Sequence, residues 1–261
     1  RREDLELTIE LRQAGQGKFV ILLHGIGSGA DSFAELTQHL VPRFSVLVWN
    51  APGYGLSSDP PRPLEPAEYG WALASALRAA GVERAVVVGH SFGAVVAAEL
   101  AKHAPELVAG VVLADASVGD GAKPAQERER RWRERCEAIA RLGPDGLAEQ
   151  RVPELLAQPG PTTAYARAMA VMRQVRAAGY QSAAWTLHQA EEMRFWLHWR
   201  KPALLLWGAQ DRVTTPEQAQ ALARAMPQAR LVLLPQAGHL SYLEALEPFA
   251  REVAQFADAV G

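Results

Sequence analysis

A serine flanked by glycines lies between an apolar run and a helix-like stretch. The segment 89–93 (Gly-His-Ser-Phe-Gly) follows the run Ala85–Val88 and precedes a stretch that Pro105 cannot continue as helix. A strand-to-helix turn this tight needs tiny residues two positions before and after the serine, because strand and helix pass close together. The serine oxygen would then lie at a helix N-terminus, whose positive dipole stabilises developing negative charge. We predict that Ser91 is a catalytic nucleophile; the alternative is a glycine-rich turn with a capping serine.

A serine hydroxyl is a weak nucleophile and needs a general base. Among the seven histidines, His239 follows the last apolar run, Arg230–Leu234, within the sequence Ala-Gly-His-Leu-Ser. A loop at the carboxyl end of that strand would lie on the same edge of the sheet as Ser91. His90 is adjacent to the serine but should point away from its oxygen. We predict that His239 is the base; the alternative is a loop histidine bonded to backbone.

Two aspartates could orient this histidine. Asp211 follows the apolar run Ala203–Trp207, and Asp115 follows the run Val108–Ala114. Either carboxylate could fix the histidine tautomer and stabilise the imidazolium. The strand–loop–helix context favours Asp211 as the catalytic acid. We expect Asp115 to hydrogen-bond loop backbone instead.

Acyl transfer also needs two hydrogen-bond donors aimed at the carbonyl oxygen. A His-Gly-Ile-Gly loop follows the apolar run Phe19–Leu23. We predict that the backbone N–H groups of Ile26 and Phe92 form this oxyanion hole, and that His24 braces the loop. A glycine turn that leads into a capped helix is the alternative, and both interpretations can hold together.

Short apolar runs predict the elements that must position these residues. Near-continuous runs rich in Val, Leu and Ile indicate strands buried on both faces, as in a parallel sheet. Helix-like stretches between most of them indicate βαβ units, and the alternating Leu5–Leu11 indicates an antiparallel edge strand. The predicted fold class is α/β, with a doubly wound, mostly parallel sheet. The runs are Phe19–Leu23, Ser45–Trp49, Ala85–Val88, Val108–Ala114, Ala203–Trp207 and Arg230–Leu234.

The strand pattern stops between about Ser117 and Arg200. We predict a helical cap of residues 117–200 inserted between two core strands, with residues 1–116 and 201–261 forming the core. Helical periodicity of the apolar positions supports this division. The expected cap helices are Glu127–Leu142, a second from Thr162 or Thr163 to Gly179, and a third that carries Trp185, Met193 and Trp196.

Apolar and aromatic cap side chains are candidates for a substrate pocket, because such pockets are mostly apolar. For most of them, packing of the cap onto the sheet is the alternative. Between residues 117 and 200, 13 Lys and Arg stand against 10 Asp and Glu, an excess too small to indicate an anionic substrate. The candidate pocket residues are Trp132, Tyr165, Met169, Met172, Trp185, Trp196 and Leu240.

Composition excludes several classes of protein. The chain has 261 residues, of which 49% are hydrophobic, enough for one compact domain with a sizeable core. A formal net charge of -2 gives no electrostatic footprint for nucleic acid. No apolar run approaches the ~18 residues of a membrane span, and none follows the polar segment 1–4 as in a signal peptide. The single cysteine, Cys136, fits a reducing compartment, so a cytoplasmic location is expected.

At these motifs the chain resembles the α/β-hydrolase superfamily over nearly its whole length. The resemblance implies an eight-stranded, mostly parallel sheet with a helical cap after the sixth strand, and a triad of Ser91, Asp211 and His239. Seven strand candidates are found here. Asn50 replaces an Asp that the family usually has before its x-Pro-Gly-x-Gly loop, which we interpret as a structural departure. The matching segments are His24-Gly25, Ala51–Ser57, Gly89–Gly93, Gly208–Pro216 and Gly238-His239.

The resemblance extends to activity. Residues 237–241 and the Gly-Ile-Gly-Ser loop are similar to 3-oxoadipate enol-lactonases and small carboxylesterases. We therefore predict a serine hydrolase of small apolar esters or lactones, a monomer or homodimer without cofactor, metal, nucleic acid or membrane. Dehalogenases and epoxide hydrolases of this fold use an aspartate nucleophile, which Ser91 argues against.

Two other functions stay open. Carbon–carbon bond hydrolases of meta-cleavage-type diketones use the same triad, but they usually carry Trp after the histidine and Asn before the serine. This chain has Leu240 and His90 at those positions. A hydrolase-derived ligand receptor is the non-enzymatic alternative, and the intact triad disfavours it.

Overall fold

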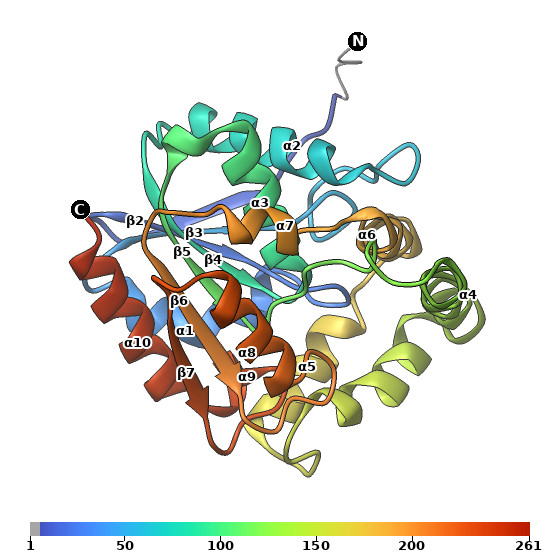
Figure 1. The fold of residues 1–261 in the computed structure, drawn as a ribbon. Coiled ribbons are helices and arrows are strands. Elements are labelled where there is room, and N and C mark those ends of the chain that lie inside the picture. Colours follow the sequence, from blue (N-terminus) through green and yellow to red (C-terminus); the bar gives the residue numbers. More distant parts are fainter. Residues whose placement is uncertain (1–5) are drawn as a thin grey trace.

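A central β-sheet organises the computed structural model, which describes residues 6–261 (Figure 1). The sheet has seven strands in the order β1-β3-β2-β4-β5-β6-β7. β1 pairs antiparallel with β3, and the other neighbouring strands are parallel. The predicted doubly wound, mostly parallel α/β sheet is confirmed. The strands are β1 (Leu11–Ala14), β2 (Phe19–Leu23), β3 (Ser45–Trp49), β4 (Ala85–His90), β5 (Val108–Ala114), β6 (Ala203–Gly208) and β7 (Arg230–Leu234).

All six continuous apolar runs form strands, whereas the alternating run does not form the expected one. The edge strand begins at Leu11, so the prediction of a strand from Leu5 is wrong for residues 6–10, and Leu5 itself lies outside the described residues. The backbone of this stretch bonds to a loop instead, since Asn50 N–H donates to Glu10 O at 3.0 Å and Ser58 N–H to Thr8 O at 2.9 Å. Residues 6–261 thus form seven strands rather than the family's eight.

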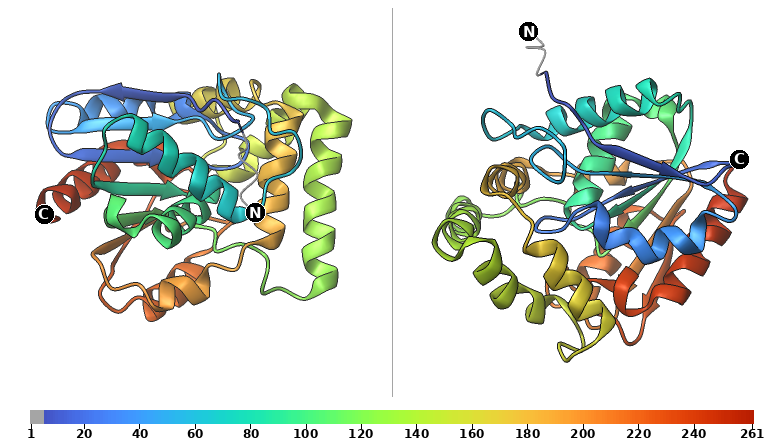
Figure 2. Two further views of the ribbon diagram at one scale, coloured as in Figure 1. Left: turned by 90° about the horizontal axis from the view of Figure 1, so that it is seen from above. Right: turned by 180° about the vertical axis from the view of Figure 1, so that it is seen from behind.

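Helices cover both faces of the sheet (Figures 1 and 2). α1 (Ala34–Leu40) packs beside α10 (Leu246–Ala259) on one face, and α2 (Pro66–Ala79) packs beside α3 (Phe92–His103) on the other. α8 (Pro216–Ala225) starts at the predicted capping box, in which Thr215 and Gln218 exchange side-chain and backbone hydrogen bonds. The remaining short elements are the 3-10 turns η1 (Ala30–Phe33) and η2 (Pro105–Leu107) and the helix α9 (Ser241–Glu244).

A helical region separates β5 from β6 and lies along one side of the sheet (Figure 2). It contains α4 (Ala125–Leu155), which kinks at Gly143, and then α5 (Thr163–Met172), α6 (Ala177–Gln189) and α7 (Met193–Leu197). We call residues 117–200 the helical insertion. None of the helices formed by residues 6–261 combines the length and the apolar character that crossing a bilayer requires.

Two predicted insertion helices are wrong in their bounds. The helix expected to reach Gly179 breaks after Met172, because Arg176 adopts an extended backbone and its side chain binds the core loop 55–59. The third predicted helix is two helices: Trp185 lies on α6, whereas Met193 and Trp196 lie on α7. The break comes at Ala190, whose carbonyl accepts a hydrogen bond from the N–H of Gly121 at 2.8 Å.

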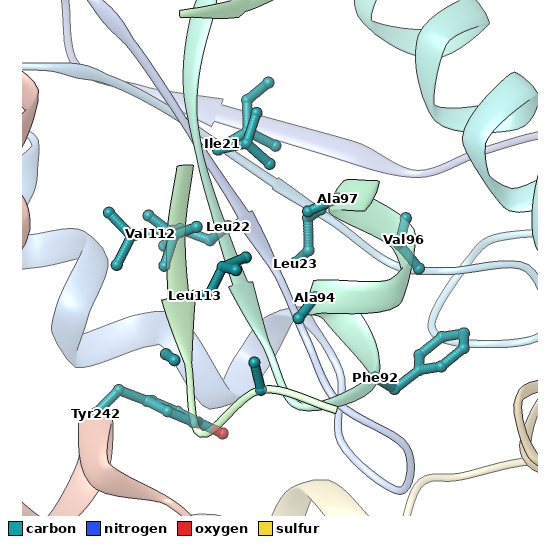
Figure 3. Packing of buried hydrophobic residues seen from close by; sticks show 14 of the residues in the cluster. Ile21, Leu22, Leu23, Phe92, Ala94, Val96, Ala97, Val112, Leu113 and Tyr242 are labelled. Carbon is teal, nitrogen blue, oxygen red and sulfur yellow. The ribbon is translucent and has the colours of Figure 1, made fainter. Parts of the chain in front are cut away.

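The core beneath the turn between β4 and α3 is closely packed. Leu22 of β2, Val112 and Leu113 of β5, and Ala94 of α3 are fully buried. In Figure 3, Leu113 lies on the α3 side of the sheet with Ala94, whereas Leu22 and Val112 lie together on the opposite face. A close-packed interior leaves little room for movement, so the ends of these strands form a rigid base for the residues that follow them.

Candidate active site

The turn between β4 and α3 holds Ser91 in an unusual backbone conformation. Its φ of 52° lies in the left-handed region, which a non-glycine residue adopts at a cost of about 1–3 kcal/mol. The flanking glycines are required sterically: a Cβ at Gly89 would lie 2.6 Å from the carbonyl oxygen of Gly93, and one at Gly93 would lie 2.1 Å from Leu23 O. The strained turn leaves the Ser91 side chain at the start of α3, as the sequence predicts.

His239 lies between Ser91 and Asp211. Its Nε2 is 3.0 Å from Ser91 Oγ, and its Nδ1 is 2.9 Å from Asp211 Oδ2. All three residues are buried. With Nδ1–H donating to the carboxylate, Nε2 presents a lone pair to the serine hydroxyl, which is the arrangement of a general base beside a nucleophile. The three residues singled out in the sequence are therefore brought together.

The Asp211 carboxylate is held in its ionised form. Its Oδ1 accepts N–H groups of Val213 at 2.8 Å and Thr214 at 3.1 Å, and its Oδ2 accepts the Thr214 hydroxyl at 2.8 Å. Burial raises the pKa of Asp211, but the attraction and hydrogen bond of His239, together with these donors, outweigh burial and lower the pKa below its ordinary value. A charged carboxylate is thus available to stabilise an imidazolium.

The other candidate aspartate, Asp115, forms no hydrogen bond with His239 in the part of the chain that the structure describes. Its Oδ1 accepts the N–H of Gly208 at 2.8 Å, and its Oδ2 bonds the hydroxyl of Ser241. Asp115 bonds backbone as expected, but its partner Gly208 is the last residue of β6 rather than part of a loop, and the contact with Ser241 had no sequence signal.

His90 points away from the nucleophile. Its Nε2 donates to the backbone carbonyl of His239 at 2.7 Å, so it supports the loop of the base rather than Ser91 Oγ. Burial, followed by repulsion from His239, lowers the pKa of His90 to about 3. His90 is therefore a neutral structural group at physiological pH.

The loop after β2 presents a candidate oxyanion donor. Among residues 6–261 the Ile26 N–H has no hydrogen-bond acceptor, and the Phe92 N–H is the first of α3, where helices leave such groups unpaired. His24 braces this loop as expected: its Nε2 accepts the Ala51 N–H at 3.1 Å and its Nδ1 lies 2.8 Å from Gly25 O. Burial lowers the pKa of His24 to about 4, which keeps it neutral in this role.

Asn50 links three segments near this loop. Its Oδ1 accepts the Ala30 N–H at 2.9 Å, and its Nδ2 donates to Glu10 Oε2 at 2.6 Å. Glu10 in turn accepts the Leu56 N–H at 2.8 Å. A carboxylate, that of Glu10, thus lies against the side chain of Asn50 and ties it to the loop at Leu56.

A cavity of about 1090 Å³ opens above the serine and is bounded by the helical insertion. One side is apolar and includes Met172, Tyr180 and Leu240. The side formed by α4 is charged, and there Arg131 and Arg135 both bind the carboxylate of Asp120, at 3.1 and 2.8 Å. Ser91, His239 and Ile26 line the cavity as well, so it gives a small molecule access to the triad.

Of the pocket residues proposed from the sequence, Met172 and Leu240 line this cavity and the others do not. Trp132 and Trp185 line a separate pocket with α2, and their rings lie 5.2 Å apart. Helical periodicity locates the apolar face of a helix, but it does not separate residues that line a cavity from those that pack. The remaining candidates pack within the protein: Trp196 is fully buried, Met169 is buried and Tyr165 is half-buried.

The sequence reasoning missed Thr214. Its hydroxyl lies 2.8 Å from Asp211 Oδ2 and 3.2 Å from His239 Nδ1, so it helps to fix the acid against the base. A signal existed, because an aspartate whose side chain accepts N–H groups two and three residues later forms a recognisable turn.

The contacts that support the loop of His239 were also not predicted from the sequence. Leu155 O accepts the His239 N–H at 2.8 Å, and the Glu244 carboxylate accepts the Gly238 N–H at 2.9 Å and the Ala157 N–H at 3.0 Å. The end of α4 therefore contacts the loop that carries His239 directly. No local pattern could show this contact, since it joins segments more than 80 positions apart.

Across the part of the chain that the structure describes, no cluster of three or more His, Cys, Asp or Glu side chains is arranged to hold a metal ion.

Comparison with known proteins gives consistent matches. The model of the alpha/beta hydrolase fold family matches residues 18–246. The pimeloyl-[acyl-carrier protein] methyl ester esterase of Chromobacterium violaceum is 31% identical over 252 residues, which cover 92% of this chain and 94% of that protein. A thermophilic esterase from Thermogutta terrifontis superposes with a TM-score of 0.90 at 24% identity, covering 97% and 94% of the two chains. The enol-lactonase from Burkholderia xenovorans LB400 gives 0.84 at 22% identity and 95% of each chain.

Proposed function

The chain belongs to the α/β-hydrolase family, and from this premise we propose that it is a cofactor-free serine hydrolase that cleaves carboxylic esters or lactones through an acyl-enzyme on Ser91. The observation that carries the proposal is the continuous hydrogen-bonded series from Ser91 through His239 to Asp211 at the floor of a substrate-sized cavity.

In the first half of the proposed reaction, Ser91 Oγ attacks the substrate carbonyl carbon while His239 Nε2 takes the hydroxyl proton. Asp211 stabilises the resulting imidazolium. The N–H groups of Ile26 and Phe92 bind the oxyanion, each contributing roughly 3 kcal/mol in the transition state. The imidazolium then returns its proton to the leaving alcohol oxygen.

In the second half, water enters as the nucleophile. His239 Nε2 takes one of its protons, the hydroxyl attacks the acyl carbon, and the same donors bind the second oxyanion. Collapse releases the carboxylic acid and returns the proton to Ser91 Oγ. A lactone follows the same steps, except that its alcohol stays attached to the acid.

The cavity suggests which part of the substrate lies where. The apolar side near Met172 and Leu240 suits an acyl chain, since apolar surface gains about 25 cal/mol per Å² on burial. The charged side formed by α4 suits a polar alcohol or carrier. The Chromobacterium relative is named for a methyl ester of a carrier-bound acyl chain, so medium-length acyl esters belong in the first substrate panel.

Covalent labelling tests the nucleophile directly. A fluorescent alkyl phosphonate should label the protein at Ser91, shown by peptide mass spectrometry, and Ser91→Ala should abolish both label and hydrolysis of p-nitrophenyl esters. Ser117→Ala, at another serine that lines the cavity, is the matched control and should keep the label. Equal turnover by wild type and Ser91→Ala would refute the proposal.

The same triad could hydrolyse a carbon–carbon bond in a vinylogous diketone. A diketone of that type, assayed beside the esters and lactones, separates the two reactions. Stoichiometric labelling with no turnover of any substrate would instead favour a hydrolase-derived receptor.

We expect the protein to act in the cytoplasm, as the single cysteine predicts.

A further inference from the structure

A second buried carboxyl group adjoins the triad and has no part in the mechanism above. Asp115 is 0% exposed and has a φ of 42°, in the left-handed region. Backbone strain of this kind persists only where the surroundings hold it, and it is concentrated at functional sites. The group therefore needs an explanation beyond packing.

Asp115 connects the segments that carry the acid and the base. Its Oδ1 accepts the N–H of Gly208, which ends β6 and leads into the Asp211 turn, at 2.8 Å. Its Oδ2 bonds the hydroxyl of Ser241, two residues after His239. Its backbone carbonyl lies 2.9 Å from the Thr214 hydroxyl oxygen, whose single proton is shared between this carbonyl and Asp211 Oδ2. Both loops thus meet at one residue.

The nucleophile is attached to the same strand end. Ala114, immediately before Asp115, accepts the backbone N–H of Ser91 at 3.0 Å. The position of Asp115 therefore affects the segments of all three triad residues.

The charges around Asp115 do not favour an ionised carboxylate. Its hydrogen-bond partners, the Gly208 N–H and the Ser241 hydroxyl, are neutral, and Asp211 is near enough to interact with it electrostatically. Asp211 is ionised and paired with His239, so a second negative charge would be repelled. An unpaired carboxylate in a dry interior costs several kcal/mol, and such groups neutralise instead.

Within residues 6–261, no cation is found that compensates for this repulsion. His90 Nε2 lies 3.9 Å from Asp115 Oδ2, but it donates to His239 O, and its lowered pKa keeps it neutral. Tyr242, the other titratable group facing this site, is a buried phenol whose pKa is raised above its ordinary value by burial. Burial, followed by repulsion from Asp211, likewise raises the pKa of Asp115 well above its ordinary value.

We propose that Asp115 is a positioning residue that remains protonated and, as a neutral acid, holds the Asp211 and His239 loops together without competing for the imidazole. The inference rests on the proposed triad. It assigns the two aspartates opposite protonation states. Asp211 is the anion that stabilises the imidazolium, and Asp115 is a carboxylic acid whose Oδ1 accepts from Gly208 N–H and whose Oδ2–H donates to the Ser241 hydroxyl oxygen.

Asparagine is the informative substitution, because a side-chain amide has the shape of a neutral acid and keeps one acceptor and one donor. In Asp115→Asn, the Gly208 and Ser241 contacts survive, so most of the activity that Asp115→Ala loses should be restored. We expect kcat in Asp115→Ala to fall by about 100-fold with little change in KM, as when catalytic groups are misplaced. Asp115→Asn should stay within about threefold of wild type.

The pH profile of kcat/KM distinguishes a neutral acid from a charged one. Replacing a neutral acid by an amide removes no charge, so the acidic limb should not move in Asp115→Asn. Replacing a carboxylate would remove a negative charge beside the base and shift that limb to lower pH.

Infrared difference spectroscopy gives a readout without substrate. The spectrum of wild type minus Asp115→Asn at neutral pH should contain the carbonyl stretch of a protonated carboxylic acid. This measurement is made on resting protein, so it stands even if Ser91 proves not to be a nucleophile and the proposed function fails.

If Asp115→Ala does not fold, as judged by circular dichroism, Asp115→Asn and the infrared band still decide the matter. A carboxylate band in place of the acid band, or a shifted acidic limb, would overturn the proposal.

Discussion

Replacing Asp211 by asparagine should invert the proton arrangement on the catalytic base. The carboxylate accepts two backbone N–H groups on Oδ1, from Val213 and Thr214, and the His239 Nδ1–H on Oδ2. An amide has one acceptor oxygen. With that oxygen on the Val213 side, both backbone bonds survive and the NH₂ faces His239. The opposite orientation sets the NH₂ against two N–H donors, each left unsatisfied at about 1–3 kcal/mol.

The favoured orientation therefore forces His239 Nδ1 to accept a hydrogen bond. The imidazole proton moves to Nε2, which lies 3.0 Å from Ser91 Oγ and then donates to the serine instead of taking its proton. A triad with the wrong tautomer loses about 10⁴-fold in kcat, or about 5.4 kcal/mol of transition-state stabilisation. KM should change little, because the cavity is not altered.

The assay is the initial rate of p-nitrophenyl butyrate hydrolysis across a range of substrate concentrations, with far-ultraviolet circular dichroism to show that the variant is folded. Thr214→Val is the matched control: it removes the hydroxyl donor to Asp211 Oδ2 but leaves the carboxylate, so we expect a loss of about tenfold. If Asp211→Asn keeps more than a tenth of wild-type kcat, the acid lies elsewhere, and Asp115 becomes the first candidate.

Three further outcomes follow from contacts away from the triad. A Cβ at Gly179 would lie 2.4 Å from Gly53 O, so Gly179→Ala should displace α6 from the core and lower the free energy of unfolding by about 1–3 kcal/mol, measured in urea; a change below a few tenths would contradict the close contact. Burial, followed by repulsion from Glu99, raises the pKa of Glu192 to about 8, above its ordinary value of 4.5 and against the lowering effect of Lys102, so wild type loses stability as pH rises toward 8 whereas Glu192→Gln does not. The difference between their free energies of unfolding should grow by up to about 1.4 kcal/mol per pH unit between roughly pH 5 and 8, and a constant difference would mean that Glu192 is ionised throughout. Trp185→Ala should keep kcat/KM within about twofold, because Trp185 lines the pocket beside α2; a large rise in KM would place it in the substrate site.

Interactions close in the sequence were predictable. A run of Val, Leu and Ile without alternation predicts burial on both faces, and the bounds of β2, β3, β5 and β7 agree with those runs. The predicted burial is wrong for β7, because this strand lies at the edge of the sheet and Leu233 is exposed. β4 and β6 extend slightly further, into the turns that carry the site.

The helical insertion was predicted as a region but not in its parts. Its helix breaks occur at Arg176, which binds the distant core loop 55–59, and at Ala190, which accepts the N–H of Gly121. Local helix propensity does not register either contact. Apolar periodicity also could not separate Met172, which lines the cavity, from Trp196, which is fully buried, since both positions exclude water.

The sequence by itself determined the turn around Ser91, because its requirements are local: small residues at positions 89 and 93, a buried strand before them and a helix after them. It could name two aspartates at strand ends but not choose between them by contact. Only the tertiary structure decided that Asp211 reaches His239 while Asp115 reaches Gly208 and Ser241. The reason is geometric, since hydrogen bonds act over about 3 Å and strand order and loop path set such distances across the sheet.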